Sequence, residues 1–137
     1  MEGSEKMNDK LFLTEEQINL LKEFLNKDAN VDFALVFGSY AKEMQKKESD
    51  LDVAIYFENP LEGVELLRYI NRLSELAGKE VDIAVLNRAS AFLRHQVMKY
   101  SSPLIIKNHL TYIRFREKTM IDYDEYRFVS GMCVYDR

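Results

Sequence analysis

Residues 31–57 read VDFALVFGSYAKEMQKKESDLDVAIYF, and this stretch decides which fold the sequence predicts. Its first part, residues 31–37, is apolar and rich in β-branched and aromatic side chains, which indicates a buried strand that ends at Gly38. Its last part, residues 50–57, alternates polar and apolar side chains, as a strand does when one face packs on a core. Between them, residues 39–44 predict a short helix, and a polar loop follows.

Helices and further strands surround this pair in the sequence. Thr14 and Gln17 form a capping-box pattern at the start of a helix that ends before Asp28. Gly78 follows residues 61–77 at the position of a C-cap glycine. The other predicted elements are a strand over 81–86, a helix over 89–100 and a short edge strand over 103–106. The order predicts an α/β (α+β) fold, a small mixed sheet backed by helices.

The helix over 61–77 is expected to turn one apolar face toward the core. That face would carry the apolar residues that follow one another at helical spacing, namely Leu61, Val64, Leu67, Ile70, Leu73 and Ala77.

Length and composition limit the possible classes of protein. The chain has 137 residues, which suits one domain, and a net charge of −4, which argues against direct binding to nucleic acid through a basic face. Cys133 is the single cysteine, so no internal disulfide can form. The start of the chain is polar and no long apolar run follows, so neither a signal peptide nor a membrane span is predicted. We therefore expect a cytoplasmic location.

The chain is expected to divide into three parts. Residues 1–10 are polar and predict a flexible leader, and residues 11–108 contain the predicted sheet and its helices. Residues 109–137 predict a C-terminal helix and an aromatic tail that packs on the domain or on a partner protein. His95 and His109 lack further histidines at ligand spacing and do not predict a zinc site, and His95 is expected on a helix surface.

Three aspartates predict a metal site. Asp50 and Asp52 occupy positions i and i+2 of one predicted strand, so their side chains project from the same face. Adjacent like charges are costly unless a cation neutralises them, and Mg²⁺ suits a few carboxylates combined with phosphate oxygens. Asp82 lies on the third predicted strand and completes a triad if that strand neighbours residues 50–57. Two metal ions at such a site would stabilise the attacking and leaving oxygens of a displacement at phosphorus.

The turn after the first strand predicts a phosphate site. Gly38 permits close approach of a triphosphate to the backbone, and the amides at a helix start favour an anion. Ser39 adds a hydroxyl donor, and Lys42 is placed to assist the phosphates. Together with the aspartates, these residues predict a metal–nucleotide site in which Asp82 can take a proton from the acceptor.

The pattern Gly38-Ser39, ten residues, Asp50-x-Asp52 resembles the signature of the DNA polymerase β-type nucleotidyltransferase superfamily. The short length and the element order resemble its minimal nucleotidyltransferases. Asn87-Arg88-Ala89-Ser90 follows the third acidic strand much as in the antitoxins of HEPN/MNT toxin–antitoxin pairs. Members of the family often carry a glycine four residues after the motif serine, where this chain has Glu43.

The resemblance implies a function for the predicted site. It implies that the chain uses ATP and magnesium to transfer AMP to a tyrosine of a partner HEPN toxin, a ribonuclease, and so silences it. It also implies that Gly38 and Ser39 hold the nucleotide while the three aspartates hold the metal.

Two other functions stay open on sequence grounds. A non-catalytic antitoxin or binding subunit could neutralise its partner by occlusion and retain the acidic residues as a relic. Transfer of a nucleotide to a small molecule or to RNA is a further alternative. RNA acceptors, however, call for more positive charge than this chain carries.

Overall fold

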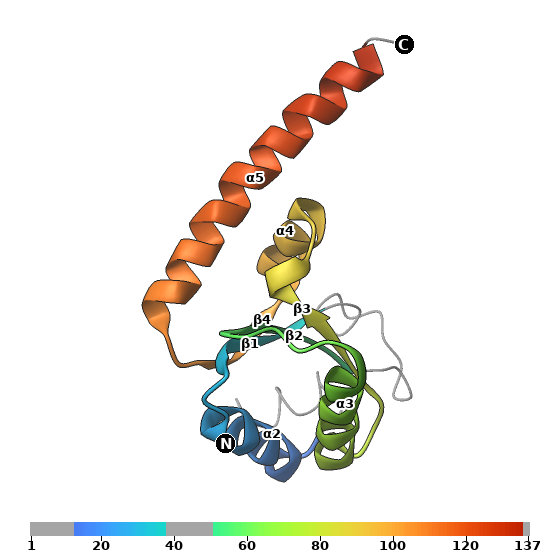
Figure 1. The fold of residues 1–137 in the computed structure, drawn as a ribbon, viewed down its shortest axis with the longest axis vertical. Helices are drawn as coiled ribbons and strands as arrows, with labels where there is room; N and C mark the ends of the chain where they lie inside the picture. Colours follow the sequence, from blue (N-terminus) through green and yellow to red (C-terminus); the bar gives the residue numbers. More distant parts are fainter. Residues whose placement is uncertain (1–12, 38–50, 136–137) are drawn as a thin grey trace.

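The computed structural model describes residues 13–37 and 51–135, which form one mixed sheet with helices on both faces (Figure 1). The strand order is β3-β2-β1-β4; β1 pairs antiparallel with β2 and with β4, while β2 and β3 run parallel. The sequence-based fold prediction is therefore confirmed. The elements are α2 (Glu15–Lys27), β1 (Val31–Phe37), β2 (Leu51–Phe57), α3 (Gly63–Ala77), β3 (Val81–Val85), a 3₁₀ turn η2 (Leu86–Arg88), α4 (Ala91–Tyr100), β4 (Ser102–Ile106) and α5 (His109–Tyr135).

One face of the sheet packs on α2 and α3. The alternation in β2 sends Val53, Ile55 and Phe57 to this side, where they join buried residues of both helices. Helix α2 begins at the predicted capping box, in which the Gln17 amide nitrogen bonds the Thr14 hydroxyl at 3.0 Å. This layer is the larger apolar core of the domain.

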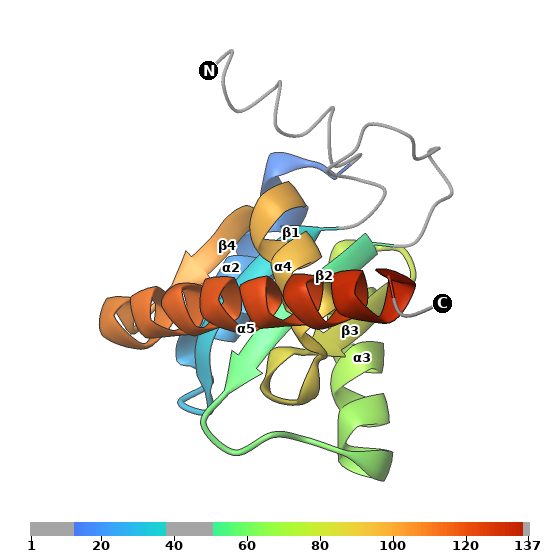
Figure 2. The same cartoon turned by 90° about the horizontal axis from the view of Figure 1, so that it is seen from above.

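The other face of the sheet packs on α4 and α5 (Figure 2). Phe33 is fully buried and lies against three rings, with centroid separations of 5.3 Å to Tyr56, 5.0 Å to Tyr112 and 5.4 Å to Phe115. Because Tyr112 and Phe115 belong to α5, this aromatic cluster attaches the start of that helix to β1.

Helix α3 differs from the sequence-based expectation. Leu73 and Ala77 are buried as predicted, but Val64 is 62% exposed and Leu67 is 61% exposed. Three residues advance only about 300° around an α-helix, so successive steps of three drift about 60° each. The residues therefore spiral around the helix instead of sharing one face, and Tyr69 and Leu76 complete the buried side.

Helix α5 is apolar on two opposite sides. Tyr112, Phe115 and Tyr123 face the rest of the domain, and Figures 1 and 2 show the helix crossing the α4 side of the sheet and continuing beyond it. The other side exposes large apolar residues to solvent: Leu110, Ile113, Met120, Ile121 and Phe128. Such a surface is typical of an interface with another protein.

Strand β4 occupies an edge of the sheet, as predicted for residues 103–106. Pro103 has no amide hydrogen and is the register partner of Leu35 in β1. An edge strand tolerates proline because one of its two sides needs no hydrogen bonds to a neighbouring strand. The predicted leader over 1–10 and the predicted helix over 39–44 lie outside the described residues. Among the described helices, none combines the length and the apolar character needed to span a membrane.

Replacing Gly78 by alanine should lower the free energy of unfolding by about 1–2 kcal/mol. Gly78 ends α3 with φ +73°, a left-handed conformation that favours glycine, and an added Cβ would lie 2.6 Å from the Gln17 side-chain nitrogen. Gln17 would then have to leave the capping box of α2, since its side-chain oxygen accepts from the Thr14 amide. Urea denaturation measures the loss.

Gly63→Ala is the matched control for this prediction. Gly63 also has a positive φ, +61°, but an added Cβ there meets nothing within 4 Å. It should therefore show only the backbone strain, about 1 kcal/mol. A loss for Gly78→Ala no greater than that for Gly63→Ala would contradict the role assigned to Gln17.

Candidate active site

Two of the three predicted acidic residues lie side by side on neighbouring strands. Asp52 of β2 is the direct register partner of Asp82 of β3. Residues directly opposite one another on paired strands point to the same face, and neighbouring strands lie about 4.8 Å apart. Asp52 is half-buried and Asp82 is exposed, so the pair opens to solvent. The sequence could place Asp82 here only on the condition that β3 neighbours β2, and that condition is met.

The end of β1 lies on the other side of Asp52. Phe37 is the register partner of Asp52 in the antiparallel pairing of β1 with β2. Phe37 is also the last residue of β1, so the chain leaves the sheet next to the acidic pair. The other predicted site residues, namely Gly38, Ser39, Lys42 and Asp50, lie outside the described residues together with Glu43.

The acidic pair lies on the α4 side of the sheet. Ala54 follows Asp52 on this face and is fully buried in the cluster that contains Val97 of α4. Ala84 follows Asp82 and joins the same cluster. The small alanine side chains let α4 approach the sheet closely. The two carboxylates lie at the end of the apolar contact between α4 and the sheet.

A side chain after β3 stabilises the register that pairs the aspartates. Asn87 donates its amide to the Phe57 carbonyl at 2.7 Å and accepts from the Phe57 amide at 3.0 Å. Phe57 and Asn87 lie two residues beyond Ile55 and Val85, the last register pair of β2 and β3, so these bonds extend the contact between the two segments. Since a slip of one residue would move Asp82 to the opposite face, Asn87 helps to hold the two carboxylates together.

The donor set fits a hard divalent cation. Two carboxylates on one face repel each other in the absence of a counter-ion, and Mg²⁺ prefers oxygen ligands of this kind. The described residues contain no group of three or more possible metal ligands, because the pair contributes two and the predicted Asp50 lies outside them. Asp52 and Asp82 are thus the two described residues that could hold a metal.

Two other residues from the sequence analysis have structural roles. Arg88 binds the start of the α3 segment, donating to the Leu61 carbonyl at 3.1 Å and lying 3.6 Å from the Glu62 carboxylate. The expectation that His95 lies on a helix surface is wrong. Its ring stacks on Tyr123 of α5 at a centroid distance of 3.6 Å, because α5 packs over α4.

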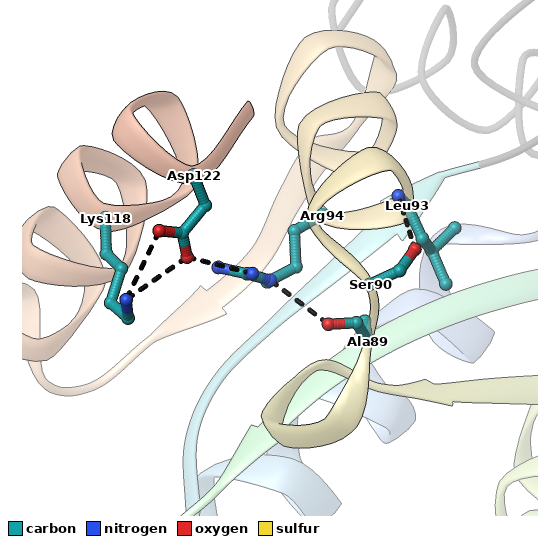
Figure 3. Close-up of polar contacts among 6 residues, drawn as sticks. All are labelled: Ala89, Ser90, Leu93, Arg94, Lys118 and Asp122. Atoms are coloured by element: carbon teal, nitrogen blue, oxygen red, sulfur yellow. Dashed lines mark hydrogen bonds and ion pairs between the residues drawn. The ribbon is translucent and has the colours of Figure 1, made fainter. Parts of the chain in front are cut away.

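A cluster of charges that no sequence pattern had predicted lies between α4 and α5. Arg94 donates to the Asp122 carboxylate at 3.0 Å, and Lys118 approaches the same carboxylate at 3.2 Å (Figure 3). The hydrogen bonds from Arg94 and then from Lys118 lower the pKa of Asp122. Only the spacing of Lys118 and Asp122, four residues apart on a helix, could have indicated a pair from sequence.

Comparison with known families gives one match that covers most of the chain. Residues 19–110 match the family model described as polymerase beta, nucleotidyltransferase. This range contains the two aspartates on neighbouring strands, residues 38–50 and helix α4.

Two sequence relatives are protein adenylyltransferases by name. One, from Methanocaldococcus jannaschii and provisionally named, is 38% identical over 66 residues, which are 48% of this chain and 67% of the relative. The other is protein adenylyltransferase MntA of Shewanella oneidensis, 28% identical over 87 residues, which are 64% of this chain and 60% of that protein.

Solved structures share the fold at lower identity. A toxin–antitoxin crystal structure with AMP-PNP matches with a TM-score of 0.74 and 22% identity, over 87% of this chain and 96% of that one. A complex of tri-AMPylated HEPN toxin with MNT antitoxin, from Shewanella oneidensis, matches with a TM-score of 0.68 and 20% identity, over 87% of this chain and 97% of that one. Both likenesses extend through most of the chain.

Proposed function

This chain belongs to the polymerase β nucleotidyltransferase family, and from that premise we propose that it transfers AMP from ATP to a tyrosine hydroxyl of a HEPN-type toxin and acts as its antitoxin. The observation that carries the proposal is the pairing of Asp52 with Asp82 beside the end of β1. The relatives named as protein adenylyltransferases support AMP as the transferred group and a protein as acceptor.

The proposed partner is a HEPN-type ribonuclease. Support comes from the fold shared with the MNT antitoxin of the AMPylated complex and from the exposed apolar side of α5. A surface with Ile121 and Phe128 open to solvent would be covered in a complex. Since the reaction consumes ATP, we place it in the cytoplasm.

The proposed metal ligands are Asp50, Asp52 and Asp82, holding two Mg²⁺ ions. When bound, Mg²⁺ would neutralise the carboxylates and stabilise negative charge on the phosphate oxygens. The paired register of Asp52 and Asp82 suits this role, because it offers carboxylate oxygens from two strands on one face.

In the proposed reaction the protein residues position the nucleotide and move one proton. Gly38 and Ser39, with Lys42, hold the β- and γ-phosphates. The acceptor tyrosine oxygen forms a bond to the α-phosphorus while the bond from that phosphorus to pyrophosphate breaks. Asp82, the more exposed of the described pair, accepts the tyrosine proton.

The test is to incubate the purified chain with ATP, Mg²⁺ and the HEPN-type toxin proposed as its partner, and to measure intact masses. The expected result is a gain of one or more AMP units on the partner, abolished when EDTA removes the metal. Peptide mapping should place the added AMP on tyrosine.

Other outcomes of this experiment identify the alternatives. A stable complex with no AMP on the partner would contradict the catalytic proposal and favour neutralisation by occlusion. AMP on serine or threonine would keep the transferase activity and reject tyrosine as the acceptor.

A further inference from the structure

A hollow with a volume of about 460 Å³ lies on the α4–α5 side of the sheet. It is lined by residues from β2, η2, α4 and α5, among them Tyr56, Asn87, Arg94, Thr111, Arg114 and Lys118. This volume is within the range of sites that hold small molecules.

The charge of this hollow is opposite to that of the whole chain. The chain has 23 acidic and 19 basic residues, yet the hollow is lined by three cationic side chains and no carboxylate. One acidic group, Asp122, lies close behind and bonds Arg94 and Lys118. Three positive charges against one negative charge leave an excess that favours an anion.

The two arginines keep unused donors. The Arg94 side chain is only 14% exposed, and it donates from Nε to the Ala89 carbonyl at 3.2 Å and from one terminal nitrogen to Asp122 (Figure 3). Its other terminal nitrogen has no hydrogen-bond partner among the described residues. The Arg114 side chain likewise has no hydrogen bond or ion pair with the described residues, and Thr111 also lines the hollow.

The hollow is separate from the acidic pair. Along the face of β2, Asp52 is followed by Ala54 and then by Tyr56, which lines the hollow. Four residues of strand span about 13 Å, and Ala54 between them is fully buried beneath the cluster that includes Val97 of α4. An anion in this hollow would therefore not reach the proposed catalytic carboxylates.

We propose that this hollow is a second binding site, one that takes the phosphoryl group of a small molecule. Arg94 and Arg114 supply guanidinium donors suited to phosphate oxygens, Lys118 adds a point charge and Thr111 a hydroxyl. Arg94 is fixed in place by Ala89 and Asp122 and so offers its free nitrogen at low entropic cost. The site does not depend on the proposed transfer reaction.

The test is a calorimetric titration of the full chain with inorganic phosphate, pyrophosphate and AMP, each in EDTA. EDTA prevents a metal ion at the acidic pair from binding the same anions. The expected result is saturable binding at one site. Arg114→Gln should weaken it roughly 10–100-fold, because a charge-assisted bond is lost, while the exposed position leaves folding intact.

Arg116→Gln is the matched control. It removes the same charge from the same helix, but Arg116 lies about 200° around α5 from Arg114, over the ring of Tyr112, and does not line the hollow. If Arg114→Gln weakens binding by removing a direct contact and not by changing the net charge, Arg116→Gln should change the affinity for the anion by no more than about twofold. Asp52→Asn should likewise leave the binding unchanged.

The three probes distinguish the source of the phosphoryl group. Tighter binding of AMP than of phosphate would identify a nucleotide, and equal or tighter binding of phosphate or pyrophosphate would identify a free anion. No saturation by any probe, equal weakening by Arg116→Gln, or loss of binding in Asp52→Asn would overturn the proposal. Saturation by a glutamate-rich peptide alone would also overturn it, in favour of an acidic protein segment.

Discussion

Asp52→Asn should reduce AMP transfer to the partner by on the order of 10²–10³-fold, because it removes the charged group that we propose as a ligand of the metal. Asp52 lies between Phe37, the last residue of β1, and Asp82. Its central position means that no neighbouring described carboxylate can replace it. The initial rate of AMP incorporation, followed by intact mass, measures the loss.

Glu58→Gln is the control for this variant. Glu58 is exposed and follows the end of β2 that lies away from the acidic pair. Glu58→Gln therefore removes one negative charge from the same segment without changing that pair. Its transfer rate should match that of the unmodified chain. The Asp52→Asn protein should still form a complex with the partner, which serves as the check that it is folded. Unchanged transfer in a folded Asp52→Asn protein would refute the assignment of Asp52 as a metal ligand.

Phe33→Ala should lower the free energy of unfolding by about 3–5 kcal/mol, a large part of the stability of a domain of this size. Phe33 is fully buried and packs against Tyr56, Tyr112 and Phe115, which belong to β2 and α5. Truncation leaves a cavity and removes the ring contacts between β1 and α5. Urea denaturation measures the loss, and near-ultraviolet circular dichroism should show weaker aromatic packing.

Two further variants make this prediction decisive. Phe92→Ala removes the same side chain from a position that is 46% exposed, where its ring approaches Tyr126 at 5.9 Å, and should cost less than about 1 kcal/mol. Phe33→Leu retains most of the apolar volume and should cost about 1.5 kcal/mol, so it reports on the site even if Phe33→Ala does not fold. Equal losses for Phe33→Ala and Phe92→Ala would contradict the central position of Phe33.

Patterns local in the sequence predicted the helices and strands and one half of the described acidic pair. The two-residue alternation of β2 placed Asp52 opposite Val53 and Ile55, and the capping box and Gly78 marked helix ends, because these signals depend on residues close together in the chain. The resemblance carried by Gly38, Ser39 and the aspartates predicted the family. The roles of Gly38, Ser39, Lys42 and Asp50 stay predictions.

Which distant segments meet is seen only in the folded chain. Folding placed β3 next to β2, which brought Asp82 opposite Asp52, and it packed α5 over α4, which stacked His95 on Tyr123 and formed the cationic hollow around Arg94. Helical and strand periodicity tells which side of an element is apolar but not which element covers it. That choice depends on burial and pairing between residues far apart in sequence, so it becomes visible only when the whole chain has packed.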